Sequence, residues 1–183
     1  MVLKSSSNPP VRSPDVASIT ALSGDWWVAH TKARFEKAFA WDLIAQKTPY
    51  LLPMIPKVTI WKGHRRKSMV PLFSSYVFFC GGPEERHRAL ATNRICQVIP
   101  VRDRKQFVRE LAAIEKALDN GAAIEFYPFA AVGKRCRVAR GPLEGLEGTV
   151  VQAMGKTRLV LHVSILGQCA SLETSIEVLE SAE

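Results

Sequence analysis

Apolar residues recur with two different periods along this chain, and the change of period separates an N-terminal part from a C-terminal part. Alternation over about four to eight residues predicts a β-strand, whereas apolar positions three and four residues apart predict an amphipathic helix. Between residues 25 and 121 the two patterns interleave. The strands expected there span residues 26–30, 50–55, 72–79 and 97–101, and the helices span about 33–47, 83–91 and 104–120. This order predicts an α+β sandwich, in which helices cover a mostly antiparallel sheet.

The third of these helices has the clearest boundaries. Asp103 can cap its first turn, and Gln106 stands three residues later, as in a capping box. Gly121 is a typical helix stop. Its apolar stripe consists of Phe107, Leu111, Ile114 and Leu118. Local sequence alone therefore predicts this helix from end to end.

The C-terminal part alternates apolar and polar positions in short runs that glycine and proline separate. The runs are residues 135–138, 149–151, 158–165, 169–173 and 176–179. The first two are joined by a segment with Gly141, Pro142, Gly145 and Gly148, which is typical of a shaped turn between strands. Unpaired sheet edges are costly for so small a unit. The pattern therefore predicts a small, closed, all-β barrel.

A strongly basic hairpin is expected at residues 57–70. Val58 and Ile60 alternate with polar neighbours, and Gly63 marks the turn. The tip carries Lys62, His64, Arg65, Arg66 and Lys67, with no acidic residue among them. Such a charge run can be a solvated face. It can equally contact a phosphate backbone, which would relieve the repulsion between the cations.

Charge is distributed unevenly between the two parts. The chain has 25 basic and 17 acidic residues, which gives a formal net charge of +8. From residue 132 onward the chain has six basic and six acidic residues, so the whole surplus of positive charge lies in the N-terminal part. A polyanion would be held by that part. The neutral barrel is expected to contact a protein.

Residues 1–24 are expected to form a flexible tail, because they lack the apolar core of a signal peptide. No apolar run approaches the roughly 20 residues of a membrane span. A cytoplasmic protein without a membrane association is therefore expected. Residues 25–121 would form the first domain, residues 122–128 a linker stiffened by Pro128, and residues 129–183 the second domain.

Cysteine usage indicates neither disulfides nor a metal site. The four cysteines are Cys80, Cys96, Cys136 and Cys169. They are widely spaced and form no CxxC pair, which is typical of buried free thiols in a reducing compartment and argues against zinc. No cofactor is expected.

Several segments, taken together and in order, resemble the NusG family of transcription elongation factors. The N-terminal part matches through Trp26-Trp27-Val28 with Lys32, Leu52-Pro53-Met54-Ile55, the basic hairpin, Pro71-Leu72-Phe73 and Tyr76-Val77-Phe78. The strand and Gly-Pro turn of residues 138–148, with the run of residues 163–167, resemble a KOW domain. The resemblance implies a NusG N-terminal domain followed by an SH3-like KOW barrel. The segment 50–55 and the compact hairpin resemble specialised paralogues of RfaH type.

This resemblance implies that the N-terminal domain binds RNA polymerase. The polymerase contacts would be His30, Tyr76, Phe78, Val98 and Ile99 towards the clamp helices, and His87 and Arg88 towards the opposite lobe. The nucleic-acid contacts, to the non-template DNA strand, would be Lys32, Lys62, Arg65, Arg66, Lys67 and Arg94. From the residues alone, a place in the core is the favoured explanation of Tyr76 and Phe78.

The resemblance further implies that the barrel binds a second protein, either the termination factor Rho or a small-subunit ribosomal protein. Ile165 and Leu166 occupy the matching positions. A monomer is expected. The implied function is antitermination and suppression of pausing, with an operon-specific role. A general elongation and Rho-dependent termination factor is the alternative. We also expect the barrel to remain β-structured, because its Gly-Pro turn and period-two strands oppose a helix.

Two other classes of function, an RNA-binding protein of the ribosome and an enzyme, fit the sequence less well. A ribosome-associated RNA-binding KOW protein would need a basic barrel, and it would leave the N-terminal domain unexplained. An enzyme would have to use His30, His64, His87 or His162 with Cys80 or Asp42. None of these residues falls in a recognisable nucleophile, metal or phosphate-loop motif, so no catalytic residue is expected.

Overall fold

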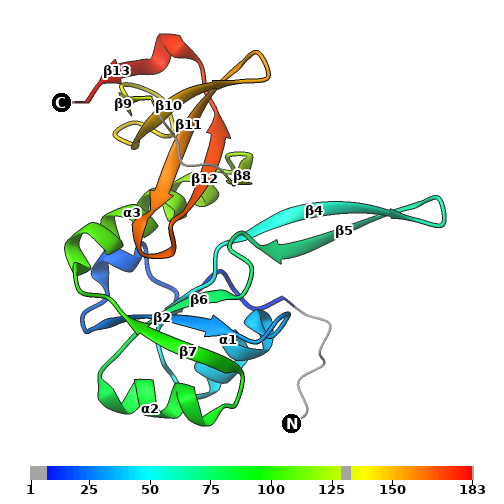
Figure 1. Cartoon of the computed structure of the whole chain (residues 1–183), viewed down its shortest axis with the longest axis vertical. Coiled ribbons are helices and arrows are strands. Elements are labelled where there is room, and N and C mark those ends of the chain that lie inside the picture. The colour runs from blue at the N-terminus through cyan, green and yellow to red at the C-terminus, as the bar shows by residue number, and fades with distance from the viewer. Residues whose placement is uncertain (1–7, 129–132, 183) are drawn as a thin grey trace. The chain divides into compact units, whose positions relative to one another are not determined.

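A computed structural model describes residues 8–128 and 133–182 of the chain (Figure 1). It contains two compact units, Met1–Arg104 and Lys105–Glu183. The helix predicted at 104–120 falls in the second unit, whereas the sequence placed the boundary after residue 121. The expected start of the second domain, residue 129, lies outside the described residues.

The first unit is built on a five-stranded antiparallel sheet with the order β1-β3-β6-β2-β7. Its strands are β1 (Arg12–Ser13), β2 (Trp26–Thr31), β3 (Tyr50–Leu51), β6 (Tyr76–Cys80) and β7 (Ile95–Pro100). The helices are α1 (Glu36–Ala45) and α2 (Pro83–Ala91), with a 3-10 turn η1 (Ile19–Ala21) before them. This architecture confirms the expected α+β class and the mostly antiparallel sheet.

One face of this sheet packs against both helices. Phe39 of α1 and Ala89 of α2 join Ala29 and Val77 of the central strands in one buried cluster. Phe39 also contacts Phe79 edge to face, with ring centroids 6.2 Å apart. Figure 1 shows α1 and α2 on the same side of the sheet. Side chains on the opposite face of β2 and β6 point away from these helices. The candidate site lies on that face.

The expectation of a flexible tail is wrong for the described residues before residue 25. Arg12 and Ser13 pair with Leu51 and Tyr50 as strand β1. The Tyr50 hydroxyl donates a hydrogen bond to the Pro10 carbonyl at 2.8 Å. Ile19 is fully buried. The segment is ordered because the free edge of β3 pairs with β1 and because the rest of the fold buries Ile19. Local composition reveals neither contact.

The segment predicted as one strand at 50–55 divides between two sheets. After β3 the chain begins a second, two-stranded sheet, β4 (Met54–Trp61) with β5 (His64–Pro71). Pro56 does not end the strand as expected, because it lies within β4 opposite Met69. A two-stranded ribbon tolerates proline, since each strand has an edge where no hydrogen bond is required. The basic hairpin is thereby confirmed and is longer than predicted.

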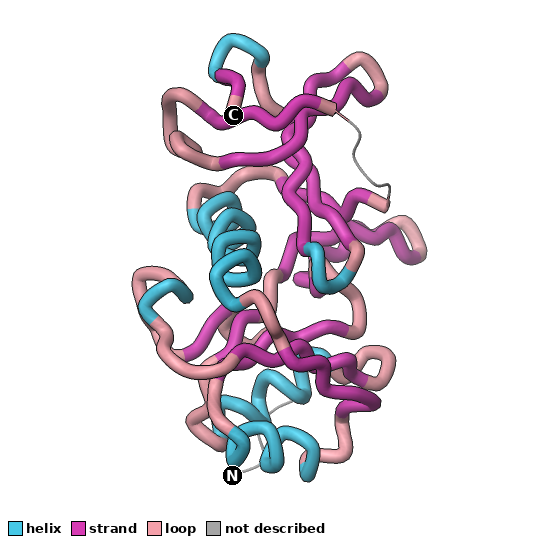
Figure 2. Tube along the Cα trace, turned by 60° about the vertical axis from the view of Figure 1, so that its left-hand side comes forward, coloured by secondary structure: helices cyan, strands magenta, loops and turns pink. Residues whose placement is uncertain are grey.

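The second unit combines helix α3 with an antiparallel sheet. The helix spans Arg104–Asp119, and the strands are β8 (Ile124–Tyr127), β9 (Lys134–Val138), β10 (Glu147–Ala153), β11 (Lys156–Val163), β12 (Gln168–Glu173) and β13 (Leu179–Ser181). The sheet order is β13-β9-β10-β11-β12-β8. The tube in Figure 2 follows α3 and these strands from another side. The all-β region after α3 agrees with the expected second domain.

Three details of this unit differ from the sequence-based expectation. Strand β8 lies in the segment expected to be a linker, and it pairs with β12. The run at 158–165 ends as a strand at Val163 and continues as a 3-10 turn, η2 (Ser164–Leu166). The run at 176–179 is largely a 3-10 turn, η3 (Ile176–Val178), because the Ser175 side chain caps it by accepting from the Glu177 amide. Within residues 133–182 and β8, the recorded pairing is linear and does not join β13 to β8.

None of the four cysteines, which all lie within the described residues, forms a disulfide; only Cys80 and Cys169 are buried, while Cys136 is half-buried and Cys96 is exposed. The expectation of four buried thiols is therefore wrong for Cys96. Within residues 8–128 and 133–182, no helix is both long enough and apolar enough to cross a membrane.

Candidate functional site

An aromatic pair lies on the sheet face that points away from α1 and α2. His30 of β2 is directly opposite Tyr76 of β6. Their rings stack with centroids 5.1 Å apart and an angle of 21° between planes. Both side chains are half-buried. Each therefore offers part of its ring to a partner while the other part is held by the sheet.

Phe78 lies on the same face, two residues further along β6, but it is fully buried. It sits opposite Val28 and contacts Phe73 edge to face, with centroids 6.2 Å apart. Phe78 is therefore covered on this face, with Phe73 against its ring, and is not itself exposed in this structure.

The two predicted residues of β7 fall on opposite faces of the sheet. Ile99 pairs with Val28 and shares the face of His30 and Tyr76. Val98 pairs with Ala29 and packs against the buried cluster beneath the helices. The structure thus brings His30, Tyr76 and Ile99 together and separates Val98 from them.

The predicted basic residues Lys32 and Arg94 are neighbours at the end of β2. The Lys32 amide donates to the Arg94 carbonyl at 2.8 Å, and the Lys32 ammonium donates to Oδ1 of Asn93 at 3.0 Å. The Arg94 guanidinium lies 5.5 Å from the centre of the Phe35 ring, which is itself exposed. Lys32 follows His30 by two residues, whereas the Arg94 guanidinium is directed towards Phe35 and towards Asp42 of α1. Phe35 is not among the contacts predicted from the sequence. The available signal was an aromatic residue close to Lys32 in the sequence.

The remaining predicted cations lie on the β4–β5 hairpin, which Figure 1 shows projecting from the five-stranded sheet of its own unit. Lys62 and Gly63 form a two-residue turn, with φ of 48° and 77° respectively. Positive φ at both positions is the signature of a type I′ turn. Every residue from 57 to 68 is exposed. Lys62, Arg65, Arg66 and Lys67 are therefore all accessible.

His87 and Arg88 lie in the middle of α2 and are exposed. Arg88 donates to Oε1 of Glu85 at 2.6 Å. The other oxygen of Glu85 accepts from the Gly82 amide at 2.8 Å and so caps the helix. Backbone hydrogen bonds, first that of Glu85 itself and then that of Gly82, hold the pKa of the Glu85 carboxyl below its usual value, and Arg88 adds to the effect.

In the second unit, Ile165 and Leu166 lie in η2 and are half-buried. Helix α3 holds this turn through Glu110, which accepts from the Ser164 amide at 2.9 Å and from the Ser164 hydroxyl at 2.5 Å. Gln106 adds a contact to the same hydroxyl at 3.1 Å. Gly167 ends the turn with φ of 60°. No local sequence pattern predicts this attachment, since Glu110 and Ser164 are 54 residues apart.

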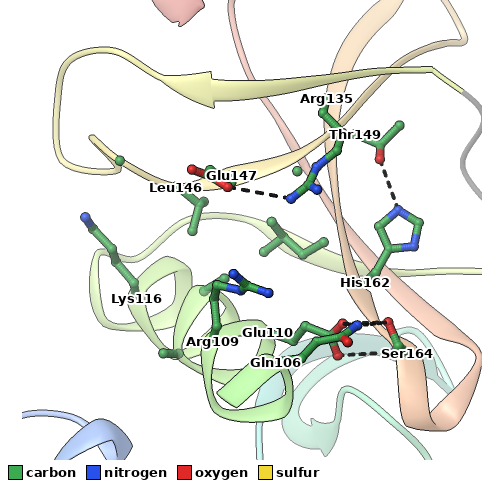
Figure 3. Close-up of a pocket in the computed structure, with 15 residues that line it drawn as sticks. Gln106, Arg109, Glu110, Lys116, Arg135, Leu146, Glu147, Thr149, His162 and Ser164 are labelled. Atoms are coloured by element: carbon green, nitrogen blue, oxygen red, sulfur yellow. Dashed lines mark hydrogen bonds and ion pairs between the residues drawn. The ribbon is translucent and has the colours of Figure 1, made fainter. Parts of the chain in front are cut away.

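A cavity of about 560 Å³ lies between α3 and the strands of the second unit (Figure 3). Cations and carboxylates alternate around it, and Arg135 lies 3.6 Å from Glu147. His162 contacts Thr149 Oγ1 at 3.2 Å and Cys169 Sγ at 3.3 Å. The Cys169 thiol is buried, so it is closed to a substrate. Among the described residues, no group of three or more His, Cys, Asp or Glu could hold a metal.

Comparison with known proteins agrees with the arrangement of the first unit. The family model described as "Transcription termination factor nusG" matches residues 24–116. A solved structure entitled "Domain interaction in Thermotoga maritima NusG" is 17% identical, and the match covers 87% of this chain and 97% of that one with a TM-score of 0.42. No curated protein matches the chain. Because the family model covers half of the chain, this protein belongs to the NusG family of transcription elongation and termination factors.

Proposed function

We propose that this protein binds RNA polymerase, suppresses pausing and acts as an operon-specific antitermination factor. The observation that carries the proposal is the stacked pair His30–Tyr76, which is half-exposed on the same sheet face as Ile99. Family membership supports a role in elongation and termination. Family members are transcription factors, so a catalytic role is not proposed.

The polymerase contact would use the surface formed by His30, Tyr76 and Ile99. Aromatic residues that are preorganised by packing are favourable anchors in protein interfaces, because little side-chain entropy is lost on binding. Phe78 would hold Tyr76 in place from the interior. Helix α2 would supply a second contact through His87 and Arg88, towards the lobe opposite the clamp.

Two separate contacts on a mobile enzyme would favour one of its conformations. A factor that bridges the clamp and the lobe binds the closed polymerase better than the open one. It therefore shifts the population towards the closed, elongating state. Reduced pausing and increased read-through follow from that shift.

The DNA contact would involve Lys32 and Arg94 together with the hairpin cations. Lys32 and Arg94 are joined by a backbone hydrogen bond, the hairpin cations lie on an exposed projection, and the surplus positive charge of the chain is in this unit. Contact with the displaced non-template strand would explain recruitment at particular operons. The second unit, whose nine basic and ten acidic residues nearly cancel, would bind Rho or a small-subunit ribosomal protein through Ile165 and Leu166.

Single-round transcription with purified polymerase tests the proposal. The template carries a pause and a terminator, and several leader sequences are compared. We expect shorter pausing and more read-through, and only on templates with a suitable leader. The Tyr76→Ala variant should lose the effect, while Phe126→Ala, which removes an exposed aromatic ring of the second unit, should keep it. An effect that is equal on every leader would instead identify a general elongation factor, and no effect on any template would overturn the proposal.

A further inference from the structure

The exposed half of the β4–β5 hairpin has two chemically different faces. Side chains that are directly opposite in an antiparallel pair point to the same side, and successive residues alternate. Trp61 pairs with His64, Thr59 with Arg66, and Lys57 with Ser68. We call this side the Trp61 face. The other side, the Ile60 face, holds Ile60 opposite Arg65 and Val58 opposite Lys67.

Trp61 is not a core residue of this protein. Its side chain is 60% exposed, although Trp26 is almost completely buried. Residues 57–68 are exposed on both faces of the hairpin. A large exposed aromatic ring on a projecting ribbon is unfavourable in water, and such a ring typically marks a binding surface.

The charge around Trp61 selects the kind of partner. The Lys62 ammonium lies 4.7 Å from the centre of the indole ring. Arg66 and Lys57 follow on the same face at alternate positions, and residues 57–67 contain no acidic side chain. An aromatic ring for a base, followed by a row of cations for phosphates, is the arrangement that binds a single nucleic-acid strand. A duplex offers no free base face, because its bases already stack on one another.

We propose that the Trp61 face binds single-stranded DNA, with one unpaired base stacked on Trp61 and the following phosphates held by Lys62, Arg66 and Lys57. The identification of the strand as DNA rests on the proposed function, in which the polymerase displaces the non-template strand. The Trp61 face is a second DNA contact, distinct from Lys32 and Arg94, and it requires a base that is not paired. It would therefore restrict the hairpin to melted DNA.

Binding of the full-length protein to a labelled oligothymidylate tests this proposal without polymerase. Base stacking contributes about 1–3 kcal/mol, so Trp61→Ala should weaken binding by about 5- to 150-fold. The slope of affinity against salt should not change, because no phosphate contact is lost. Tryptophan fluorescence of the natural protein should be quenched by the oligonucleotide. In Trp61→Phe, which keeps a ring for stacking, most affinity should remain while this quenching disappears.

Arg65 and Arg66 provide a matched pair, because they are adjacent, equally charged and on opposite faces. Arg66→Ala should weaken binding and reduce the salt slope by about 0.7, the value for one phosphate of a single strand. Arg65→Ala should change both quantities less. Circular dichroism and thermal unfolding would establish that each variant is folded.

Three outcomes would overturn the proposal. The first is a duplex of the same length that binds as tightly as the single strand, and the second is tighter binding of oligouridylate than of oligothymidylate. The third is a Trp61→Ala variant with unchanged oligonucleotide affinity and weaker polymerase capture, which would make the hairpin a protein contact. Because the oligonucleotide assay contains no polymerase, its failure is separate from failure of the transcription experiment.

Discussion

Arg94 and Asp42 form an ion pair that joins the residue before β7 to helix α1. The Arg94 Nε donates to Asp42 Oδ2 at 2.6 Å, and both side chains are about one-third exposed (34% and 30%). The pair holds the guanidinium next to the exposed ring of Phe35. Its structural role and its proposed DNA contact can therefore be separated by mutation.

Asp42→Asn and Arg94→Ala are expected to have different effects on DNA binding. Partly exposed ion pairs contribute little, so each change should lower the free energy of unfolding by less than about 1 kcal/mol. Arg94→Ala should also weaken binding of a non-template oligonucleotide, because it removes a cation. Asp42→Asn should maintain or strengthen that binding, since it removes a competing carboxylate. Equal losses of oligonucleotide affinity in the two variants would show that binding depends on the geometry of the ion pair and not on the charge of Arg94.

Tyr76 and Phe78 are expected to separate binding from stability. Phe78→Ala removes a fully buried ring and should cost about 3–5 kcal/mol of unfolding free energy. Tyr76→Ala removes a half-buried ring and should cost clearly less while abolishing polymerase binding. Chemical denaturation and capture of polymerase measure the two properties. If Tyr76→Ala retained full polymerase binding, the surface formed by His30, Tyr76 and Ile99 would not be the polymerase contact.

Tyr50 is expected to make the stability of the first unit depend on pH in the alkaline range. Burial raises the pKa of the Tyr50 phenol far above its ordinary value. The unfolded chain ionises near pH 10 while the folded chain remains protonated. Stability is therefore fully present below about pH 10 and is lost as the pH rises above it.

Tyr50→Phe should flatten this part of the stability curve, and it should cost about 1 kcal/mol at neutral pH through loss of the hydrogen bond to Pro10. Denaturant unfolding at several pH values between 8 and about 11 measures both effects. A curve of the same slope in the variant would assign the alkaline loss to other groups.

Glu110 is expected to protect the turn that carries Ile165 and Leu166. A charged acceptor on the Ser164 amide contributes more than a neutral one. In Glu110→Ala, hydrogen exchange at the Ser164 amide should accelerate by about tenfold or more. The neighbouring Arg109→Ala serves as the control, because Arg109 also lines the cavity but makes no hydrogen bond to the turn. Equal exchange in both variants would mean that the turn is ordered without α3.

The parts of this fold that could be predicted are those governed by local chemistry. Helix α2 begins at Pro83 and helix α3 ends just before Gly121, as the sequence indicated, because proline and glycine act on their own backbone. The basic hairpin was predictable for the same reason, through Gly63 and alternation.

The parts that could not be predicted depend on pairing between distant segments. Val98 and Ile99 could only be assigned to faces once β7 was paired with β2, where the register shifts between His30 and Thr31. Strand β8 forms because β12 offers it an edge, and Ile124 then becomes buried. Phe78 and Tyr76 have the same alternation, yet Phe73 covers only one of them.

The two-residue turn at Lys62 and Gly63 constrains how the hairpin can change length. Because the turn sets the pairing, adding one residue to each strand between the turn and the sheet would reverse the direction in which Trp61 points relative to the unit. Adding two to each strand would restore it. Relatives with longer or shorter hairpins should therefore differ by even steps per strand wherever the aromatic residue is used, and odd steps should accompany its loss.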